Sequence, residues 1–178
     1  MDLYQAIQNR SSIRKYQPDP VPNDILLKIL EAARAAPSWA NKQCWRFLVV
    51  KDAERKKELA ASLPEGNPAT KAVAAAPVVV VACADPKASG HVEGKDYYLL
   101  DVGIAMQQLV LAAFAEGLGT CWVAWMDEDA IRKACNVPED FRVVALTPVG
   151  FPAKEARSIP RKDLSEIAFA ETWGQSIE

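Results

Sequence analysis

Two polar stretches near the start of the chain carry side chains that suit a phosphate and a flat ring. The first is Arg10-Ser11-Ser12-Ile13-Arg14. If it is extended, Arg10, Ser12 and Arg14 lie on one side, because side chains alternate along an extended segment. Two guanidinium groups and a hydroxyl on one surface suit a phosphate better than a lone carboxylate. A solvated basic turn has the same composition, so this stretch alone does not decide between the two.

The second stretch follows a segment that is expected to be helical. It contains Ser38, Asn41 and Gln43, interleaved with Trp39 and Trp45. Amides and hydroxyls beside flat aromatic surfaces suit a planar heterocycle with polar edges. A polar loop capped by a tryptophan of the core would have the same residue types. The two stretches therefore have to be interpreted together.

Together, at this spacing, they resemble the nitroreductase family of flavin enzymes. Its members have an R-x-S-x-R-like phosphate clamp near residue ten, then P-V-P and a helix, then A-P-S-x-x-N-x-Q-x-W-R-F before the first strand. The corresponding residues here are Arg10 to Arg14, Pro20-Val21-Pro22, and Ala36 to Phe47. The resemblance extends from Tyr4 to Leu164, which is nearly the whole chain.

The resemblance implies an α+β fold with a mixed, largely antiparallel sheet surrounded by helices, a long central helix and a C-terminal extension onto the partner subunit. It also implies a single FMN-binding domain over residues 1–178 and a homodimer whose two cofactor sites are built from both subunits. Without the resemblance, interleaved strands and helices predict only an α/β-type layered domain. The chain has no G-x-G-x-x-G motif of a Rossmann dinucleotide site.

The family motifs also imply which residues bind the cofactor. They place the phosphate at Arg10, Ser11, Ser12 and Arg14, the ring edge at Pro37, Ser38, Trp39, Asn41 and Gln43, the reactive nitrogen near Val123 and Ala124, and further phosphate or ring contacts at Arg161 and Lys162. The register of the last pair within Ser158–Lys162 is ambiguous, and both also fit plain surface cations.

Three residues depart from the family pattern. Trp125 is bulky in a region where relatives often have small glycines, Trp39 is larger than the usual residue, and Cys44 stands where proline is common. We therefore expect a smaller or more selective pocket than that of a general nitroarene reductase.

Composition excludes several other classes of protein. The 21 Lys+Arg and 23 Asp+Glu nearly cancel, which argues against a broad nucleic-acid surface. The apolar stretch Tyr97 to Ala115 is interrupted by Asp101, Gln107 and Gln108, so it predicts a buried helix rather than a membrane span. Met1 to Tyr4 does not have the pattern of a signal peptide.

The thiols and the single imidazole predict no catalytic side chain. The four cysteines form no C-x-x-C pair, so we expect reduced, mostly buried thiols of a cytoplasmic protein. His91 is the only histidine, which is too few for a metal site or a usual nucleophile–base pair. Any reaction is then expected to take place on the flavin, with no metal.

Hydrophobic periodicity and breaker residues predict the order of the elements. We expect helices over Asp2 to Asn9, from a cap at Asn23 to Pro37, over Ala53 to Ser62, before Pro77, over Tyr97 to Ala115, and from a cap at Asp127 to Asn136. We expect strands at Phe47–Val50, which should be central, and at Val78–Ala84, Thr120–Ala124 and Val143–Val149, with a loop over Asp85–Gly94. A basic patch, Arg157–Lys162, precedes an apolar tail, Leu164 to Trp173, which should pack on another copy of the protein.

The combined interpretation is an FMN-dependent oxidoreductase. Hydride would pass from NADH or NADPH through bound FMN to a small organic acceptor, such as a nitroaromatic or a quinone, in a ping-pong cycle. Three alternatives remain: a specialised flavin enzyme of the same fold (a reductive dehalogenase or a flavin-fragmenting enzyme), a flavin-binding protein without turnover, and a structural dimer without cofactor.

Overall fold

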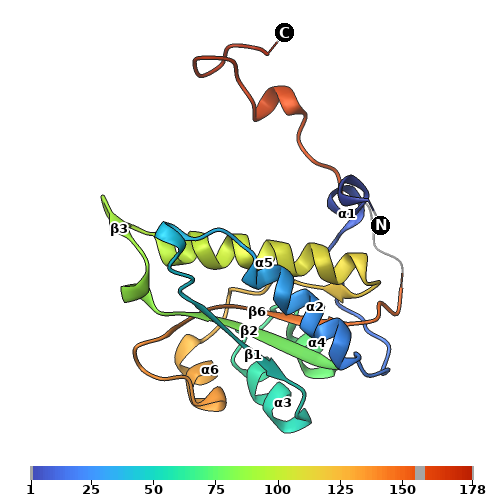
Figure 1. The fold of residues 1–178 in the computed structure, drawn as a ribbon. Helices are drawn as coiled ribbons and strands as arrows, with labels where there is room; N and C mark the ends of the chain where they lie inside the picture. The colour runs from blue at the N-terminus through green and yellow to red at the C-terminus, as the bar shows by residue number, and fades with distance from the viewer. Residues whose placement is uncertain (1, 155–158, 178) are drawn as a thin grey trace.

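The computed structural model describes residues 2–154 and 159–177. At its centre, the described residues form a four-stranded antiparallel sheet in the order β1-β2-β6-β5 (Figure 1). The strands are β1 (Trp45–Val50), β2 (Val78–Ala84), β5 (Gly119–Thr120) and β6 (Arg142–Gly150). The predicted α+β architecture with a largely antiparallel sheet is confirmed.

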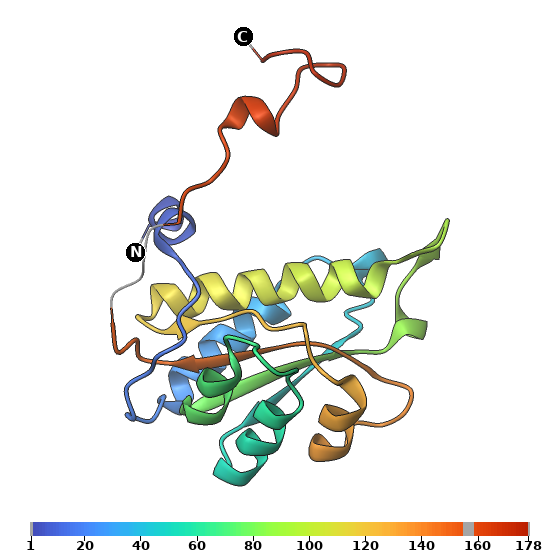
Figure 2. The same ribbon diagram turned by 180° about the vertical axis from the view of Figure 1, so that it is seen from behind.

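Helices cover both faces of the sheet (Figures 1 and 2). On one face lie α2 (Asn23–Arg34) and α5 (Tyr97–Ala115); on the other lie α3 (Ala53–Ala61), α4 (Thr70–Ala75) and α6 (Glu128–Cys135). Since side chains alternate along a strand, β2 serves both layers. Val78 and Val80 join the α2–α5 core, whereas Val79 and Val81 join the α3–α4–α6 core. This two-sided burial explains why β2 is apolar throughout.

Helix α5 is the long central helix that the sequence predicted. By length and composition alone it could cross a membrane, but its position in the fold gives a different reason for its apolar character. One side, including Val102, Met106 and Leu109, packs in the core with α2 and the sheet. Another side leaves Leu100 and Ile104 exposed to water. The chain thus buries α5 incompletely.

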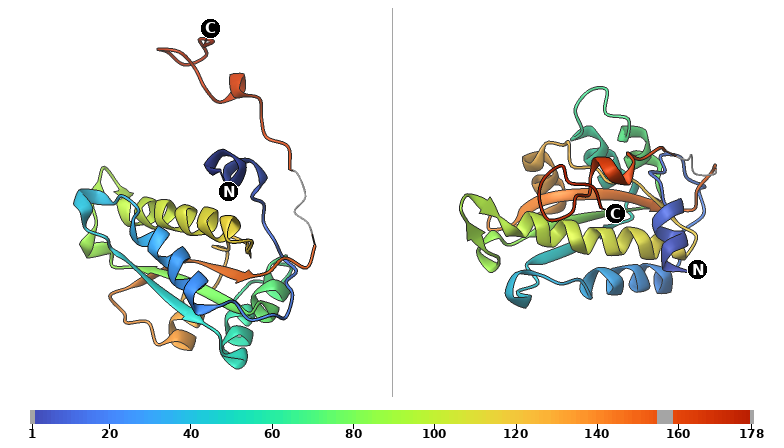
Figure 3. Two further views of the ribbon diagram at one scale, coloured as in Figure 1. Left: turned by 45° about the vertical axis from the view of Figure 1, so that its right-hand side comes forward. Right: turned by 90° about the horizontal axis from the view of Figure 1, so that it is seen from above.

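Both ends of the chain carry further uncovered apolar side chains. Helix α1 (Leu3–Asn9) buries only Ala6 and exposes Leu3 and Ile7. The tail, residues 159–177, leaves the body of the molecule and contains only the short 3-10 turn η3 (Leu164–Glu166) (Figure 3). Its Trp173 is 92% exposed. Arg157 and Ser158 of the predicted basic patch lie outside the described residues.

Two strand predictions were wrong. Strand β1 pairs only with β2 among the described residues, so it is an edge strand and not a central one. Arg46 and Val49 of this strand are exposed to water, one on each face of the sheet. The strand predicted over Thr120–Ala124 is shorter: β5 ends at Thr120, and only an isolated bridge between Val123 and Leu146 continues the pairing.

Two local predictions also need correction. Asn23 is the first residue of α2 and not its cap; Pro22 precedes the helix, and the Asn23 side chain accepts a hydrogen bond from Lys51 Nζ at 2.6 Å. The predicted loop over 85–94 contains the short turn η2 (Pro86–Ala88) and the first strand of a hairpin, β3 (His91–Val92) with β4 (Lys95–Asp96). The cap at Asp127 is confirmed, because its carboxylate accepts from Ala130 N at 3.1 Å.

These two ends of helices yield a stability prediction. Asp127→Ala removes a side-chain cap and should lower the free energy of unfolding by about 1 kcal/mol. Asn23→Ala is the matched control, because Asn23 caps nothing and its contact with Lys51 is exposed; its cost should stay within about 0.5 kcal/mol. Urea denaturation followed by circular dichroism measures both. Equal losses would contradict the assignment of the caps.

Candidate functional site

The basic segment from Arg10 to Arg14, here called the clamp segment, is extended, which is the condition under which Arg10, Ser12 and Arg14 share one side. Ser12 forms a parallel bridge with Thr120, and Ile13 N donates to Thr120 O at 2.8 Å. Ser11 is buried and Ile13 faces Gly119, so alternation along the segment places residues 10, 12 and 14 on the opposite side. The clamp segment is therefore held against β5 with its arginines directed away from the core.

Tyr16 fixes the end of this segment. Its hydroxyl donates to Ile13 O at 2.6 Å and lies 3.2 Å from Pro148 O in β6. Its backbone also forms a bridge with Pro152. Burial raises the pKa of Tyr16, so the hydroxyl keeps its proton and remains a donor.

Gly119 allows the clamp segment to approach the sheet this closely. A Cβ at Gly119 would lie 2.7 Å from Ile13 Cβ, which is shorter than any ordinary contact. Position 119 thus has to be glycine because any side chain there would overlap Ile13. Because Gly119 directly precedes Thr120, the absence of a side chain lets the clamp segment come close enough to pair with Thr120.

The arginines of the clamp segment lack acidic partners among the described residues. No ion pair there involves Arg10 or Arg14. Burial raises the pKa of the Cys121 thiol, and the Arg14 and Ser12 side chains act against this rise. Cations grouped with a hydroxyl and without carboxylates fit an anion such as a phosphate.

The loop from Pro37 to Gln43, here called the ring-edge loop, has an unusual backbone. Ala40, Asn41 and Gln43 have φ values of 45°, 56° and 49°. Residues other than glycine rarely adopt this left-handed backbone conformation, which costs roughly 1 kcal/mol for each residue. The loop is closed by Gln43 N, which donates to Ser38 Oγ at 2.9 Å. The Asn41 and Gln43 amides remain exposed, where a ligand could reach them.

Asp101 anchors the other end of this loop. Its carboxylate accepts a hydrogen bond from Trp39 N at 2.9 Å and another from Ser89 Oγ at 2.8 Å. The Trp39 ring lies 4.5 Å from the ring of Tyr97. A Cβ at Gly90 would be 2.6 Å from the Trp39 ring, so this ring packs directly against the backbone at the base of the β3–β4 hairpin. Sequence reasoning treated Asp101 only as an interruption of an apolar helix; an acid inside such a helix was the available signal.

The clamp segment and the ring-edge loop lie at opposite ends of α5 (Figure 1). The loop contacts Tyr97 and Asp101 in its first turns, whereas the clamp segment pairs with Thr120 just beyond its end. A helix of 19 residues is about 28 Å long, which is farther than one mononucleotide reaches. One chain therefore does not bring the predicted site residues together.

The remaining predicted residues lie in two places. Val123 is buried in the α3–α4–α6 core and bridges Leu146 in the middle of β6, and Ala124 beside it is exposed. Asn67 Nδ2 donates to Trp125 O at 3.0 Å, an anchor that sequence reasoning missed. Arg161 and Lys162 are exposed in the tail, where Arg161 contacts only backbone carbonyls among the described residues.

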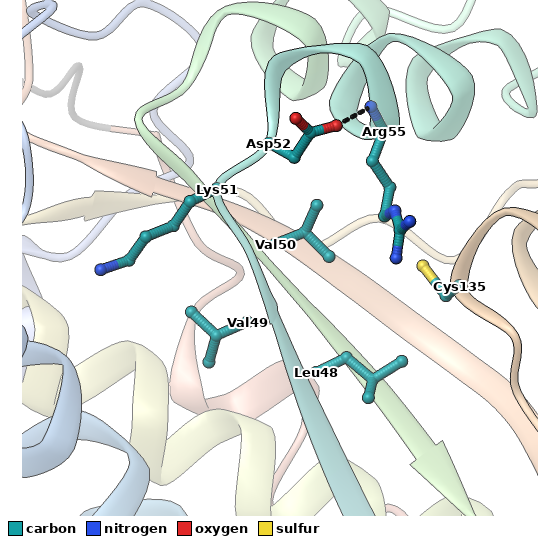
Figure 4. A pocket seen from close by; sticks show the side chains of 7 residues that line it. All are labelled: Leu48, Val49, Val50, Lys51, Asp52, Arg55 and Cys135. Carbon is teal, nitrogen blue, oxygen red and sulfur yellow. Dashed lines mark hydrogen bonds between the residues drawn. The ribbon is translucent and has the colours of Figure 1, made fainter.

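A cavity of about 310 Å³ lies elsewhere, at the end of edge strand β1 (Figure 4). It is lined by residues 48–52, Arg55 and Cys135. Burial raises the pKa of Cys135, which leaves its thiol protonated. None of the predicted site residues lines this cavity. The described residues contain no group of three or more His, Cys, Asp or Glu side chains placed to hold a metal ion.

The chain matches the family model described as Nitroreductase family over residues 7–151. A Methanothermobacter thermautotrophicus protein with the provisional name NADH dehydrogenase/NAD(P)H nitroreductase is 36% identical, with 86% of this chain and 79% of that protein covered. The crystal structure of a nitroreductase family protein from Clostridium novyi NT is 41% identical with a TM-score of 0.83, covering 99% of this chain and 97% of that chain. An FMN-dependent nitroreductase from Clostridium difficile R20291 is 27% identical with a TM-score of 0.83, covering 96% and 99%.

Relatives named for other reactions also match. The 5,6-dimethylbenzimidazole synthase of Rhodospirillum rubrum is 29% identical, with 86% of this chain and 83% of that protein covered. The iodotyrosine deiodinase of Nematostella vectensis is 24% identical, with 93% and 74% covered. Proteins similar to this chain thus carry the names of more than one chemistry.

The anchoring of the clamp segment yields the next prediction. Tyr16→Phe removes the hydroxyl that donates to Ile13 O and should lower the free energy of unfolding by about 1 kcal/mol. Because the folded-state pKa of Tyr16 is raised, its contribution is complete below the ordinary tyrosine pKa of about 10 and is lost as the pH rises above it. Stability of the variant should therefore fall less steeply above pH 10.

The matched control is Tyr4→Phe, because Tyr4 is exposed on α1. Urea titrations of both variants at neutral and alkaline pH measure the effect. If Tyr16→Phe matched the wild type at both values, the clamp segment would not depend on this hydroxyl.

Proposed function

Since the chain belongs to the nitroreductase family, as its sequence predicted, we propose that this NAD(P)H-dependent oxidoreductase works through bound FMN. It accepts hydride equivalents from NADH or NADPH and passes electrons to a small organic acceptor, such as a nitroaromatic or a quinone, in a ping-pong cycle. Residues 1–178 act as one FMN-binding domain, and we expect the protein in the cytoplasm. The observation that carries the proposal is the clamp segment, whose two arginines have no acidic partner among the described residues.

Each part of the site has a role in holding the cofactor. Arg10, Ser11, Ser12 and Arg14 hold the phosphate through charge-assisted hydrogen bonds. Asn41 and Gln43 offer exposed amides to the edge of the ring, and Val123 and Ala124 line the approach to its reactive nitrogen. Arg161 and Lys162 supply further positive charge. When bound, FMN supplies two-electron storage, the chemistry that this chain's side chains lack.

A homodimer would bring these parts together. In a two-fold dimer the same patch of each subunit contacts its counterpart. The exposed side of α5 continues from Leu100 and Ile104 to Gln107, near the middle of the helix. If two α5 helices pack antiparallel through this side and cross near their middle, the start of each helix lies beside the end of the other. The ring-edge loop of one subunit then approaches the clamp segment of its partner. The exposed apolar residues of α1 and the tail offer further surface for this contact.

The thiols and the histidine support chemistry on the cofactor rather than on a side chain. Burial, followed by the Asp101 carboxylate, raises the pKa of Cys44 to about 12, and burial does the same for Cys83. Neither becomes a thiolate nucleophile near neutral pH. His91 pairs with Asp96 at 2.6 Å within the exposed hairpin and has no catalytic partner among the described residues.

A specialised acceptor is the second candidate. The relatives named as a benzimidazole synthase and a deiodinase support this possibility. In this chain Trp125 is 65% exposed beside Ala124, and a side chain of that size narrows the space for an acceptor. A flavin-binding protein without turnover would have the same binding residues, and the titration below distinguishes it from an enzyme.

Anaerobic titration of the purified, FMN-loaded protein tests the function. NADH or NADPH should bleach the flavin absorbance, and a quinone or nitroaromatic added afterwards should restore it. Bleaching without recovery by these acceptors would favour the specialised enzyme. A bound flavin that neither nicotinamide reduces would contradict an oxidoreductase and favour a carrier or sensor.

The phosphate assignment yields a binding prediction. Arg14→Ala should weaken FMN binding by roughly 1.5–3 kcal/mol, the loss of hydrogen bonds to a charged group. Binding of riboflavin, which has no phosphate, should not change. Lys15→Ala is the matched control, because Lys15 is an exposed neighbouring cation on the other side of an extended segment. Fluorescence titration measures the affinity of wild type and both variants for FMN and for riboflavin. Equal FMN affinity of Arg14→Ala and wild type would overturn the assignment.

The shared site is tested by subunit complementation. Arg14→Ala chains are co-expressed with chains that carry Asn41→Ala and Gln43→Ala, at concentrations of FMN that saturate only the wild type. Mixed dimers contain one intact site and one site with all lesions, so the mixture should bind roughly a quarter of the wild-type FMN. Each parent dimer should bind little. A mixture that binds no more than its parents would place both halves of the site in one chain.

A further inference from the structure

Asp101 is an uncommon carboxylate because it is 3% exposed and has neutral donors only. Trp39 N lies 2.9 Å from Oδ1, Ser89 Oγ 2.8 Å from Oδ2, and the Cys44 thiol 3.5 Å from Oδ2. No described cation forms an ion pair with it. A buried charge is costly unless hydrogen bonds satisfy it. Trp39 and Cys44 come from the segment before β1 and Ser89 from the loop before α5, so the Asp101 carboxylate links these two segments to each other.

The ring-edge loop needs such an anchor. Three of its residues, Ala40, Asn41 and Gln43, are in the left-handed region, so the loop relaxes to another conformation unless contacts hold it. Ser38 Oγ holds its end through Gln43 N. The bond from Trp39 N to Asp101 is the contact that ties its beginning to the rigid helix α5.

We propose that Asp101 is the positioning residue of the ring-edge loop: its hydrogen bond to Trp39 N keeps the Asn41 and Gln43 amides in the orientation that binds the flavin ring. Asp101 touches neither cofactor nor substrate and acts through the loop. Ser89 and Cys44 orient the carboxylate so that Oδ1 meets Trp39 N. This inference rests on the proposed function, since it requires a bound flavin.

The position of Asp101 makes its effect different from that of the clamp segment. Asp101 serves the ring end of the cofactor, and the clamp segment serves the phosphate end. Loss of Asp101 should therefore weaken binding of FMN and of riboflavin by the same factor, whereas loss of Arg14 affects FMN only. General destabilisation of the fold would lower the melting temperature without producing this pattern in folded protein.

The experiment compares Asp101→Ala, Asp101→Glu and Asp101→Asn in the full-length protein. Ala removes the acceptor, Glu keeps the charge but moves the oxygen, and Asn keeps an oxygen acceptor at the same place for Trp39 N. Folded Ala and Glu variants should bind both FMN and riboflavin at least about tenfold more weakly. Asn should stay within about threefold of wild type. If Asp101→Ala does not fold, the FMN and riboflavin affinities of Asp101→Glu test the inference.

The midpoint potential of the bound flavin gives an independent readout. The reduced ring carries negative charge at its pyrimidine end, which oriented amide donors stabilise. Misplaced amides in the Ala or Glu variant should therefore make the potential more negative, and Asn should restore it. An unchanged riboflavin affinity in a folded Ala or Glu variant, a loss limited to FMN, or an Asn variant as weak as Ala would each overturn the inference. Wild-type protein that binds no flavin would instead overturn the proposed function.

Discussion

The length of α5 is the constraint on which the rest of the structure depends. The helix separates the clamp segment from the ring-edge loop, because the loop contacts its first turns and the clamp segment pairs just beyond its last. The helix is about 28 Å long, and no rotation of side chains spans a separation of that order. The same helix leaves Leu100 and Ile104 exposed. The length of α5 thus accounts both for the separation of the clamp segment from the ring-edge loop and for the apolar surface between them. A second copy of the chain packed on this surface would cover it and bring the two segments together.

Precision at the two ends of α5 comes from different physical sources. At the clamp end, shape decides, because Gly119 provides the space for Ile13 and Tyr16 ties the segment to β6. At the other end, hydrogen bonding decides, because strained backbone has to be held by Asp101 and Ser38. The steric fit between Gly119 and Ile13 does not depend on solvent, whereas the hydrogen bonds of Tyr16 and Asp101 depend on keeping water away from buried polar groups.

The sequence predicted the elements with strong local signals. The valine run of β2 is buried on both faces, and Asp127 caps α6, which ends at a left-handed Asn136. Motif spacing also indicated the family. Strand order was not accessible, because whether β1 lies at an edge depends on partners distant in sequence. For the same reason the sequence did not reveal that residues 10–14 and 37–43 lie apart, or that Asp101 joins two loops.

The uncovered tail has a consequence for the life of a newly made chain. Trp173 and Ile167 extend into water on a segment that the body of the molecule does not protect. Exposed apolar side chains of this kind attract chaperones and proteases, and they favour aggregation. When assembly covers such a surface, the survival of each chain depends on how many others are present, by mass action. If a second copy covers residues 159–177, the persistence of each chain would depend on the rate at which the protein is made.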